Sequence, residues 1–208
     1  MYEFQPTSST TRIWHFDGNV YGYLSKNLTI FEPFGSHSYI SSSYGQAIQL
    51  VSAGMTRADV SDISTGPFTI SVLFNKASLP DSTDTVHEII GIGDYTAEGH
   101  KTAIQIRYSG GNYYLGGYRD NIDPGVASCE AQYAFQINTW YNVIMTYSFP
   151  DTKIYINGNL LASGKVLTEE NLGTAETVFV SNSGVGYTIR YDEAWIENKA
   201  WSAAAVSL

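Results

Sequence analysis

The chain places apolar residues at every second position in many short segments, which is the pattern of β-strands with one buried face. The clearest segment is 68–74, where Phe68, Ile70, Val72 and Phe74 occupy alternate positions. No stretch longer than a few residues has the period of an amphipathic helix. The pattern therefore predicts an all-β protein.

Turn sequences join two pairs of these segments. Residues 103–108 and 113–118 flank Ser-Gly-Gly-Asn, and residues 153–156 run into Asn157-Gly158, a dipeptide that tolerates two consecutive positive φ angles. Both pairs are predicted to be β-hairpins. Further strands are predicted at 13–16, 47–51, 88–92, 140–147, 178–181 and 188–196. About ten strands in all suit two stacked antiparallel sheets.

Three segments carry more detailed expectations. Residues 140–147 are apolar on both faces, which predicts a central strand covered on both sides. Period-two burial is expected to bring Ile70, Ile144 and Ile154 into one layer between the sheets. Residues 202–206 form the one helical candidate, with Ser202 as N-cap, and the serine-rich run 36–44 is interpreted as a loop.

Composition and charge narrow the classes of partner. The 208 residues include 20 acidic and 11 basic ones, for a net charge of −9, and no cluster of Lys and Arg. This field would repel a phosphate backbone or an anionic bilayer, so neither nucleic acid nor membrane is an expected partner. A low charge density with 16 tyrosines favours a neutral, hydrogen-bonding surface that suits a sugar or a protein.

The cysteine content and the N-terminal segment bear on the location of the protein and on its division into domains. A single cysteine, Cys129, allows no intramolecular disulfide and is interpreted as a small buried residue. The N-terminus has no basic region followed by an apolar one, so no signal peptide is predicted, and no segment is long enough to span a membrane. Residues 1–12 are expected to be a polar arm and residues 13–208 one domain, located outside the cell or on a virion surface.

Several short motifs occur in an order that is typical of one superfamily. They are WHFDGN (14–19), GQAIQL (45–50), GPFTIS (66–71), WYNVIMTY (140–147) with KIYING (153–158), YDEAWI (191–196) and AWSAA (200–204). From about residue 13 onwards the chain resembles laminin-G-like domains of the concanavalin A-like lectin and glucanase superfamily. Where family members often place a Glu that completes a capping box, this chain has Ala205.

The resemblance implies a two-sheet antiparallel jelly-roll sandwich of the concanavalin A type. It implies no single function, because this sandwich serves as lectin, adhesion module, glycan hydrolase and structural part. It also leaves open a calcium ion at the sandwich rim, for which Asp94 and the loop 120–123 offer oxygen donors. No other cofactor is expected.

Catalysis is the weakest of the functional hypotheses. Glycan hydrolysis needs two carboxyl groups about 5 to 9 Å apart. Strict strand alternation would put Glu193 and Glu197 on one face about 13 Å apart, at about 3.3 Å per residue, and isolate Asp192 on the other face. No catalytic residue is therefore predicted.

The histidines also give no sign of a catalytic or metal site. They are His15, His37, His87 and His100. They lack the spacing of zinc ligands, so no metal site is predicted, and they are expected at the surface or rim.

The best candidate for ligand contact is the tyrosine-rich segment 113–121. Aromatic rings stack on the apolar face of a sugar while charged and amide groups bond its hydroxyls. The candidate residues are Tyr113, Tyr114, Tyr118, Arg119, Asp120 and Asn121. The alternative is that these tyrosines only pack against one another across neighbouring strands.

Two functional hypotheses remain in front. The first is a non-catalytic recognition or adhesion module that binds a carbohydrate, such as a host-surface glycan, or a protein. The second is a structural virion component, such as a bacteriophage capsid decoration or tail protein, whose polar arm docks on other subunits of the viral particle. A glycan hydrolase is the third.

Overall fold

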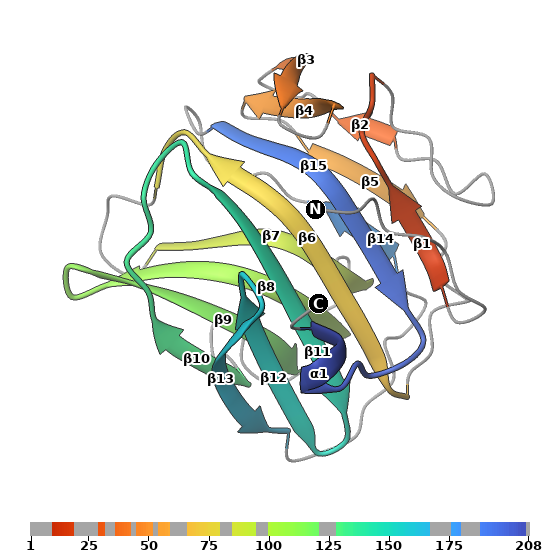
Figure 1. Ribbon diagram of the computed structural model, residues 1–208, viewed down its shortest axis with the longest axis vertical. Helices are drawn as coiled ribbons and strands as arrows, with labels where there is room; N and C mark the ends of the chain where they lie inside the picture. Colours follow the sequence, from red (N-terminus) through yellow and green to blue (C-terminus); the bar gives the residue numbers. More distant parts are fainter. Residues whose placement is uncertain are drawn as a thin grey trace.

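A computed structural model shows two antiparallel β-sheets packed face to face, with α1 on the outer side of one sheet (Figure 1). The predicted all-β sandwich is therefore confirmed. The structure describes residues 10–18, 29–31, 36–42, 45–51, 54–58, 66–79, 85–94, 100–120, 128–166, 176–179 and 188–206.

The larger sheet has eight strands, with β6 at its centre. In spatial order they are β13 (Asn159–Lys165), β12 (Asp151–Ile156), β11 (Trp140–Ser148), β6 (Phe68–Lys76), β15 (Thr188–Glu197), β4 (Gly45–Val51) and β3 (Ser36–Ser42), with β1 (Thr10–Trp14) paired to β15. Strand β15 pairs with β6 along one edge and with β4 and then β1 along the other edge. The end of β1 therefore lies close to the start of β4.

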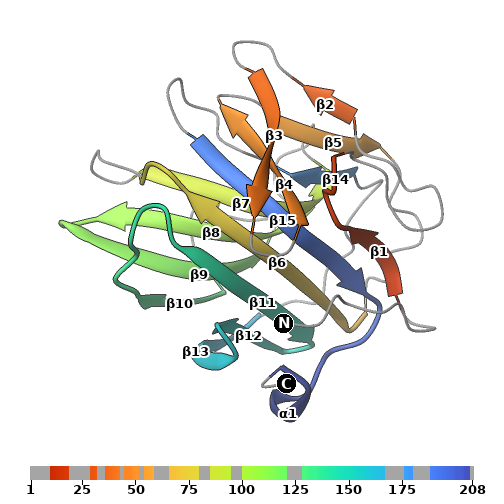
Figure 2. The same cartoon turned by 45° about the horizontal axis from the view of Figure 1, so that its top comes forward.

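The second sheet has seven strands. In spatial order they are β10 (Cys129–Gln132), β9 (Asn112–Asp120), β8 (His100–Ser109), β7 (Thr85–Asp94), β14 (Glu176–Phe179), β5 (Gly54–Ala58) and β2 (Thr29–Phe31). Two views agree that β2 and β5 lie at the same end of the molecule as β3 and β4 (Figure 2).

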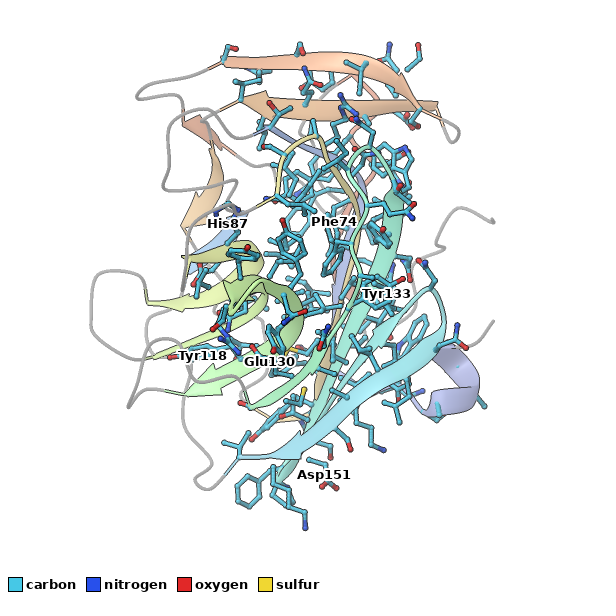
Figure 3. The ribbon with its side chains drawn as sticks, turned by 90° about the vertical axis from the view of Figure 1, so that its left-hand side faces the viewer. Phe74, His87, Tyr118, Glu130, Tyr133 and Asp151 are labelled. Atoms are coloured by element: carbon cyan, nitrogen blue, oxygen red, sulfur yellow. The ribbon has the colours of Figure 1, made fainter. Side chains whose placement is uncertain are left out.

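The main core fills the space between the two sheets (Figure 3). Phe68, Ile70, Val72 and Phe74 are fully buried there, as their alternation predicts. The hydroxyl of Tyr191 on β15 donates a hydrogen bond of 2.6 Å to the carbonyl of Ile89 on β7 and so joins the two sheets. Burial raises the pKa of this phenol well above its ordinary value.

A second, smaller apolar cluster lies on the outer face of the eight-stranded sheet. Ile144 of β11, Tyr155 of β12 and Trp195 of β15 pack there against Val206 of α1 (Ala203–Val206). Strand β11 is thus covered on both faces, as predicted. Ile144, however, belongs to this outer cluster and does not share a layer with Ile70 and Ile154, because residues 143 and 145 take the inward positions.

The local turn and cap predictions are also confirmed. Asn157 and Gly158 adopt φ angles of 49° and 79° between β12 and β13, and Asn157 Oδ1 accepts a 3.0 Å bond from the Asn142 amide. Ser202 directly precedes α1 as its N-cap, and its hydroxyl accepts a 3.3 Å hydrogen bond from the Ala205 amide. No described helix is long and apolar enough to cross a membrane.

Four strands differ from or extend the sequence prediction. The run 36–44, interpreted as a loop, contains strand β3, and β2, β5 and β10 were not predicted. Strand β3 is an edge strand with mostly exposed or half-buried side chains, so its sequence lacks an apolar face. Strand β1 begins at Thr10, which places residues 10–12 of the expected arm in the sheet; residues 1–9 lie outside the described part.

Candidate functional site

A β-bulge interrupts β15 in the middle of the larger sheet. Tyr191 pairs with Phe74 and Ala194 pairs with Val72, so β15 carries one more residue than β6 between these points. All four residues are buried in the core, so Asp192 and Glu193 together replace a single outward position. The expectation that alternation isolates Asp192 from Glu193 was therefore wrong, because a bulge resets the alternation.

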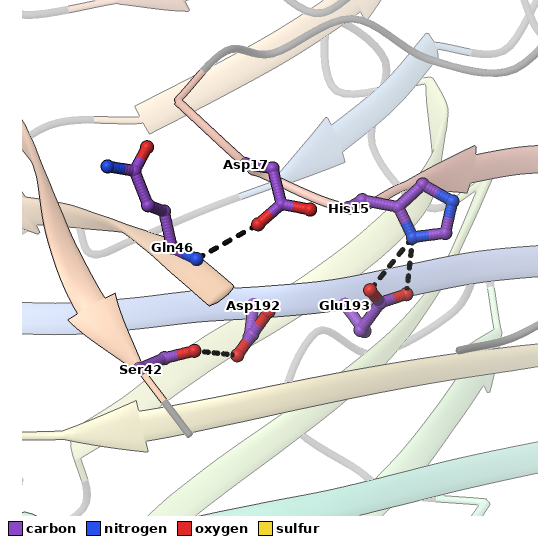
Figure 4. A network of polar contacts seen from close by, with 6 residues as sticks. All are labelled: His15, Asp17, Ser42, Gln46, Asp192 and Glu193. Carbon is purple, nitrogen blue, oxygen red and sulfur yellow. Dashed lines mark hydrogen bonds and ion pairs between the residues drawn. The ribbon is translucent and has the colours of Figure 1, made fainter. Parts of the chain in front are cut away.

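The bulge lies where β15 exchanges one neighbour for another. Its residues before the bulge pair with β4, and those after it pair with β1. Residues that follow β1, end β3 and begin β4 therefore meet the two carboxylates in one polar network (Figure 4). The network consists of His15, Asp17, Ser42, Gln46, Asp192 and Glu193.

Both carboxylates of the bulge are engaged by protein groups. His15 Nδ1 lies 2.8 and 2.9 Å from the two oxygens of Glu193. Ser42 Oγ donates a 2.5 Å hydrogen bond to Asp192 Oδ2. The network thus ties the ends of β1 and β3 to the centre of the sheet.

Asp192 is the most perturbed acid of this network. Its side chain is only 1% exposed, and Oδ1 has no hydrogen-bond partner. Burial, opposed by the Ser42 hydrogen bond and assisted by the charges of Glu193 and Asp17, raises the pKa of Asp192 to about 6. A raised pKa suits a general acid, but so buried a group does not present its proton to a polysaccharide.

Replacing Asp192 with Asn is expected to stabilise the domain by about 1 to 2 kcal/mol at pH 7.5. The folded pKa lies above the unfolded value of 3.8, so the carboxyl group favours the folded state below pH 4 and loses this contribution as the pH rises through 6. Asn carries no charge and can still accept the Ser42 bond. Urea unfolding at pH 4.5 and 7.5 measures the effect, and a variant less stable than wild type at pH 7.5 would contradict it.

A second polar arrangement crosses the outer face of the same sheet. One residue from each of five adjacent strands lies in register with the next, and their chain neighbours, such as Leu50 and Phe74, are buried in the core. We name this set the polar row: Ser38 (β3), Gln49 (β4), Arg190 (β15), Asn75 (β6) and Trp140 (β11). It runs perpendicular to the strands.

The guanidinium of Arg190 organises the polar row. Its Nε donates to Gln49 Oε1 at 2.9 Å, and its Nη1 donates to Asn75 Oδ1 at 3.2 Å and to Asn138 Oδ1 at 3.1 Å. Asn138 precedes β11 and has a positive φ of 58°, which turns the chain towards the row. Trp140 is partly exposed beside Asn75. An aromatic ring, amides and a fixed cation are groups that recognise a sugar.

The sequence-predicted tyrosines do not form one surface. Tyr114 faces outward on the seven-stranded sheet, where the Arg107 guanidinium lies 4.7 Å from its ring centre. Tyr113 takes the opposite face, packs against the core and contacts the ring of Tyr108 at 5.0 Å. Strand alternation separates the two residues.

The rest of the predicted set is equally dispersed. Tyr118 is only 2% exposed, so its ring is not available for stacking on a ligand, which corrects that part of the prediction. Arg119 and Asp120 end β9, and their side chains are not described; Asn121 lies outside the described residues. Sequence reasoning missed the polar row, although Asn75 and Arg190 stand out as polar residues within apolar strands.

The expected metal and thiol chemistry can be compared with the described residues. Among them, no group of three or more His, Cys, Asp or Glu side chains is placed to hold a metal ion. Asp94 ends β7 with its side chain undescribed, and residues 121–123 lie outside the described part. Cys129 is buried as predicted, and burial raises the pKa of its thiol to about 11.

Two of the histidines occupy well-defined surroundings. His87 is buried between the sheets, contrary to the expected surface position, because it occupies an inward position on β7 opposite Ile106. His37 is exposed and packs edge-on against Tyr39. The side chain of His100 is not described.

Comparison with known proteins agrees with this architecture. Residues 50–207 match the family described as the concanavalin A-like lectin/glucanases superfamily. The chain therefore belongs to this superfamily. No curated protein matches the sequence closely enough to show a relative.

Solved structures share the fold at low sequence identity. Domain 4 of AbnA, an extracellular GH43 arabinanase from Geobacillus stearothermophilus in complex with arabinotriose, has a TM-score of 0.69 and 18% identity, with 96% of this chain and 97% of that chain covered. The botulinum neurotoxin serotype G binding domain has a TM-score of 0.64 and 13% identity, with 94% and 49% covered. The binding domain of botulinum neurotoxin DC in complex with SialylT has a TM-score of 0.62 and 16% identity, with 96% of this chain and 50% of that chain covered. This chain spans about half the length of those two toxin domains.

Proposed function

We propose that this domain is a non-catalytic carbohydrate-binding module and that its ligand lies along the polar row. The observation that carries the proposal is the alignment of Trp140, Asn75 and Arg190 on one sheet face. The partly exposed indole of Trp140 offers a stacking surface, and the half-buried side chains of Arg190 and Gln49 offer donors and acceptors for hydroxyl groups. Asn75 is buried and holds the guanidinium in place. The polar groups are already held in place by one another, which lowers the entropic cost of binding.

The similar structures support a binding role. One is a domain of an arabinanase in complex with arabinotriose, and another belongs to a toxin whose cell entry depends on two ganglioside molecules. These ligands belong to the neighbouring proteins. For this chain we propose only the same chemical class of ligand, a carbohydrate. These neighbours lend no support to the virion hypothesis, and an extracellular location is proposed with the carbohydrate role.

A glycan hydrolase is less well supported than a binding module. Of the two consecutive carboxyl groups on β15, Glu193 is engaged by His15 and Asp192 is buried against Ser42. A hydrolase needs one carboxyl group to reach the glycosidic oxygen and another to reach the anomeric carbon or its water. The geometry of the bulge favours a structural role for both groups.

Replacing Trp140 with Ala is expected to weaken glycan binding about tenfold or more, because the stacking surface for the sugar ring is lost. A glycan array with the wild-type domain would identify ligands, and isothermal titration calorimetry would give the dissociation constants. The expected result is a large loss of affinity with an unchanged circular dichroism spectrum.

Two further variants make this test specific. Leu160→Ala removes an exposed apolar side chain from β13 and should leave affinity unchanged. Tyr114→Ala tests the tyrosine-rich segment as a rival site on the other sheet. Loss of binding in Tyr114→Ala with full binding in Trp140→Ala would move the site to β9, and no binding to any glycan would overturn the proposed function.

A further inference from the structure

Among the described residues, no carboxylate pairs with Arg190. Its side chain is half-buried, and all of its hydrogen bonds go to neutral amide oxygens, those of Gln49, Asn75 and Asn138. Arg107 on the other sheet shows the usual alternative, because Glu130 accepts from its Nε at 2.9 Å and from its Nη2 at 2.6 Å. Arg107 and Arg190 are therefore satisfied in different ways.

One nitrogen of the Arg190 guanidinium, Nη2, is available to donate hydrogen bonds to a ligand. A guanidinium has five N–H groups, and the contacts of Arg190 use the one on Nε and the two on Nη1. Within the described part of the chain, no group accepts from the two N–H groups of Nη2. Because the amides come from β4, β6 and the turn before β11, they fix the guanidinium plane from three sides while leaving Nη2 to donate elsewhere.

The nearest acids along the strand do not neutralise this cation. Glu193 is paired with His15, and Asp192 accepts from Ser42. The charged groups that shift the pKa of Asp192 are Glu193, Asp17 and His15. A partly desolvated cation with no counterion is costly, and an anion that arrives with the ligand would recover part of that cost.

We propose that Arg190 binds the carboxylate of an acidic sugar, so that the ligands of this module are glycans that contain a sialic or uronic acid. This inference rests on the proposed carbohydrate-binding function. Trp140 lies two strands from Arg190, roughly 10 Å at about 4.8 Å per strand spacing. An acidic sugar on Arg190 and the neighbouring ring on Trp140 would fit this separation.

The net charge of −9 does not conflict with such a ligand. Each exposed charge is largely screened beyond about 8 Å at physiological ionic strength, so the fixed cation dominates for a ligand with one carboxylate. A polyanion with a charge on every unit would still meet the repulsive field of the whole domain.

Pairs of ligands that differ only in charge test the proposal. Calorimetry at 0.15 M salt would compare trigalacturonic acid with its fully methyl-esterified form, and 3′-sialyllactose with lactose. We expect the acidic member of at least one pair to bind about ten to a hundred times more tightly, as for a charge-assisted hydrogen bond. Arg190→Gln should abolish this preference, because the affinity for the acidic member falls by a larger factor than the affinity for the uncharged member.

Control variants and outcomes separate this inference from the proposed function. Arg107→Gln removes an arginine that already has a carboxylate partner and should keep the preference. If Arg190→Gln does not fold by circular dichroism, the wild-type Arg190 Nε–H resonance should shift on titration with the acidic but not the uncharged sugar. Equal binding of acidic and uncharged members in both pairs would overturn this inference alone, whereas no binding of any sugar would overturn both.

Discussion

Replacing Gly164 with Ala is expected to destabilise the domain by about 2 to 4 kcal/mol. The reason is that β13 passes close to the start of β10, an edge strand of the seven-stranded sheet. A Cβ atom on Gly164 would lie 1.9 Å from the carbonyl oxygen of Ser128 and 3.1 Å from the Cβ of Cys129. Backbone atoms cannot rotate away as a flexible side chain can. One of the two strands would therefore have to move, at the cost of its sheet pairing.

Two substitutions provide controls for this effect. Ser163→Ala changes the exposed neighbour on the same strand and should alter the free energy of unfolding by less than about 0.5 kcal/mol. Gly111→Ala places a side chain at a φ of 82° with no atom within 4 Å, so only backbone strain of about 1 kcal/mol is expected. Urea unfolding measures all three. A Gly164→Ala variant as stable as the Ser163→Ala variant would refute the close approach.

Replacing Lys76 with Met is expected to stabilise the domain by about 1 to 3 kcal/mol at pH 7. Lys76 of β6 and His87 of β7 are 4% and 3% exposed, and the lysine Nζ donates to His87 Nδ1 at 3.2 Å. Burial lowers the pKa of Lys76 to about 8. Burial, together with the charge of Lys76, lowers the pKa of His87 to about 3. A cation between the sheets with one neutral acceptor is poorly compensated.

The pKa shifts of Lys76 and His87 determine how the stability of the domain changes with pH. The folded pKa of Lys76 is below its ordinary value of 10.5, so the unfolded chain binds more protons between pH 8 and 10.5 and stability rises with pH across that window. For His87, stability is lost as the pH falls from 6.5 towards 3. Lys76→Met should remove the alkaline rise and keep the acid loss.

Lys153→Met is the matched control for Lys76→Met, because Lys153 is an exposed lysine on β12. It should change neither the stability at pH 7 nor the alkaline rise. Part of the stability gained in Lys76→Met is lost again, because His87 Nδ1 no longer has a hydrogen-bond donor; this loss is about 1 kcal/mol. A Lys76→Met variant less stable than wild type at pH 7 would show that the pair is well compensated.

The candidate site illustrates the limit of pattern reasoning. Alternation located the inward residues of β6 correctly, but Ile144 of β11, expected inside, lies in the outer cluster. Alternation also failed at Asp192, where one extra residue in β15 puts two consecutive acids on the outer side. Alternation also separates Tyr113 from Tyr114, which a composition argument had grouped together. The aromatic ring of Tyr118 could stack on a sugar, but the side chain is buried.

The sequence by itself determined the class of fold, the central strands, both hairpins and the final helical turn. These features depend on local signals, namely the two-residue period of 68–74, the positive φ tolerated by Asn157-Gly158 and the cap at Ser202. Each signal acts within a few residues, so it can be read without knowing where the chain returns.

Only the tertiary structure decided which distant residues meet. Arg190 reaches Gln49 and Asn75 because β15 lies between β4 and β6 in one particular register, and Lys76 meets His87 because two sheets pack face to face. A shift of one residue in any of these strands would turn the same side chains to the opposite face. Strand order and register arise from the packing of the whole core, and for that reason no local pattern contains them.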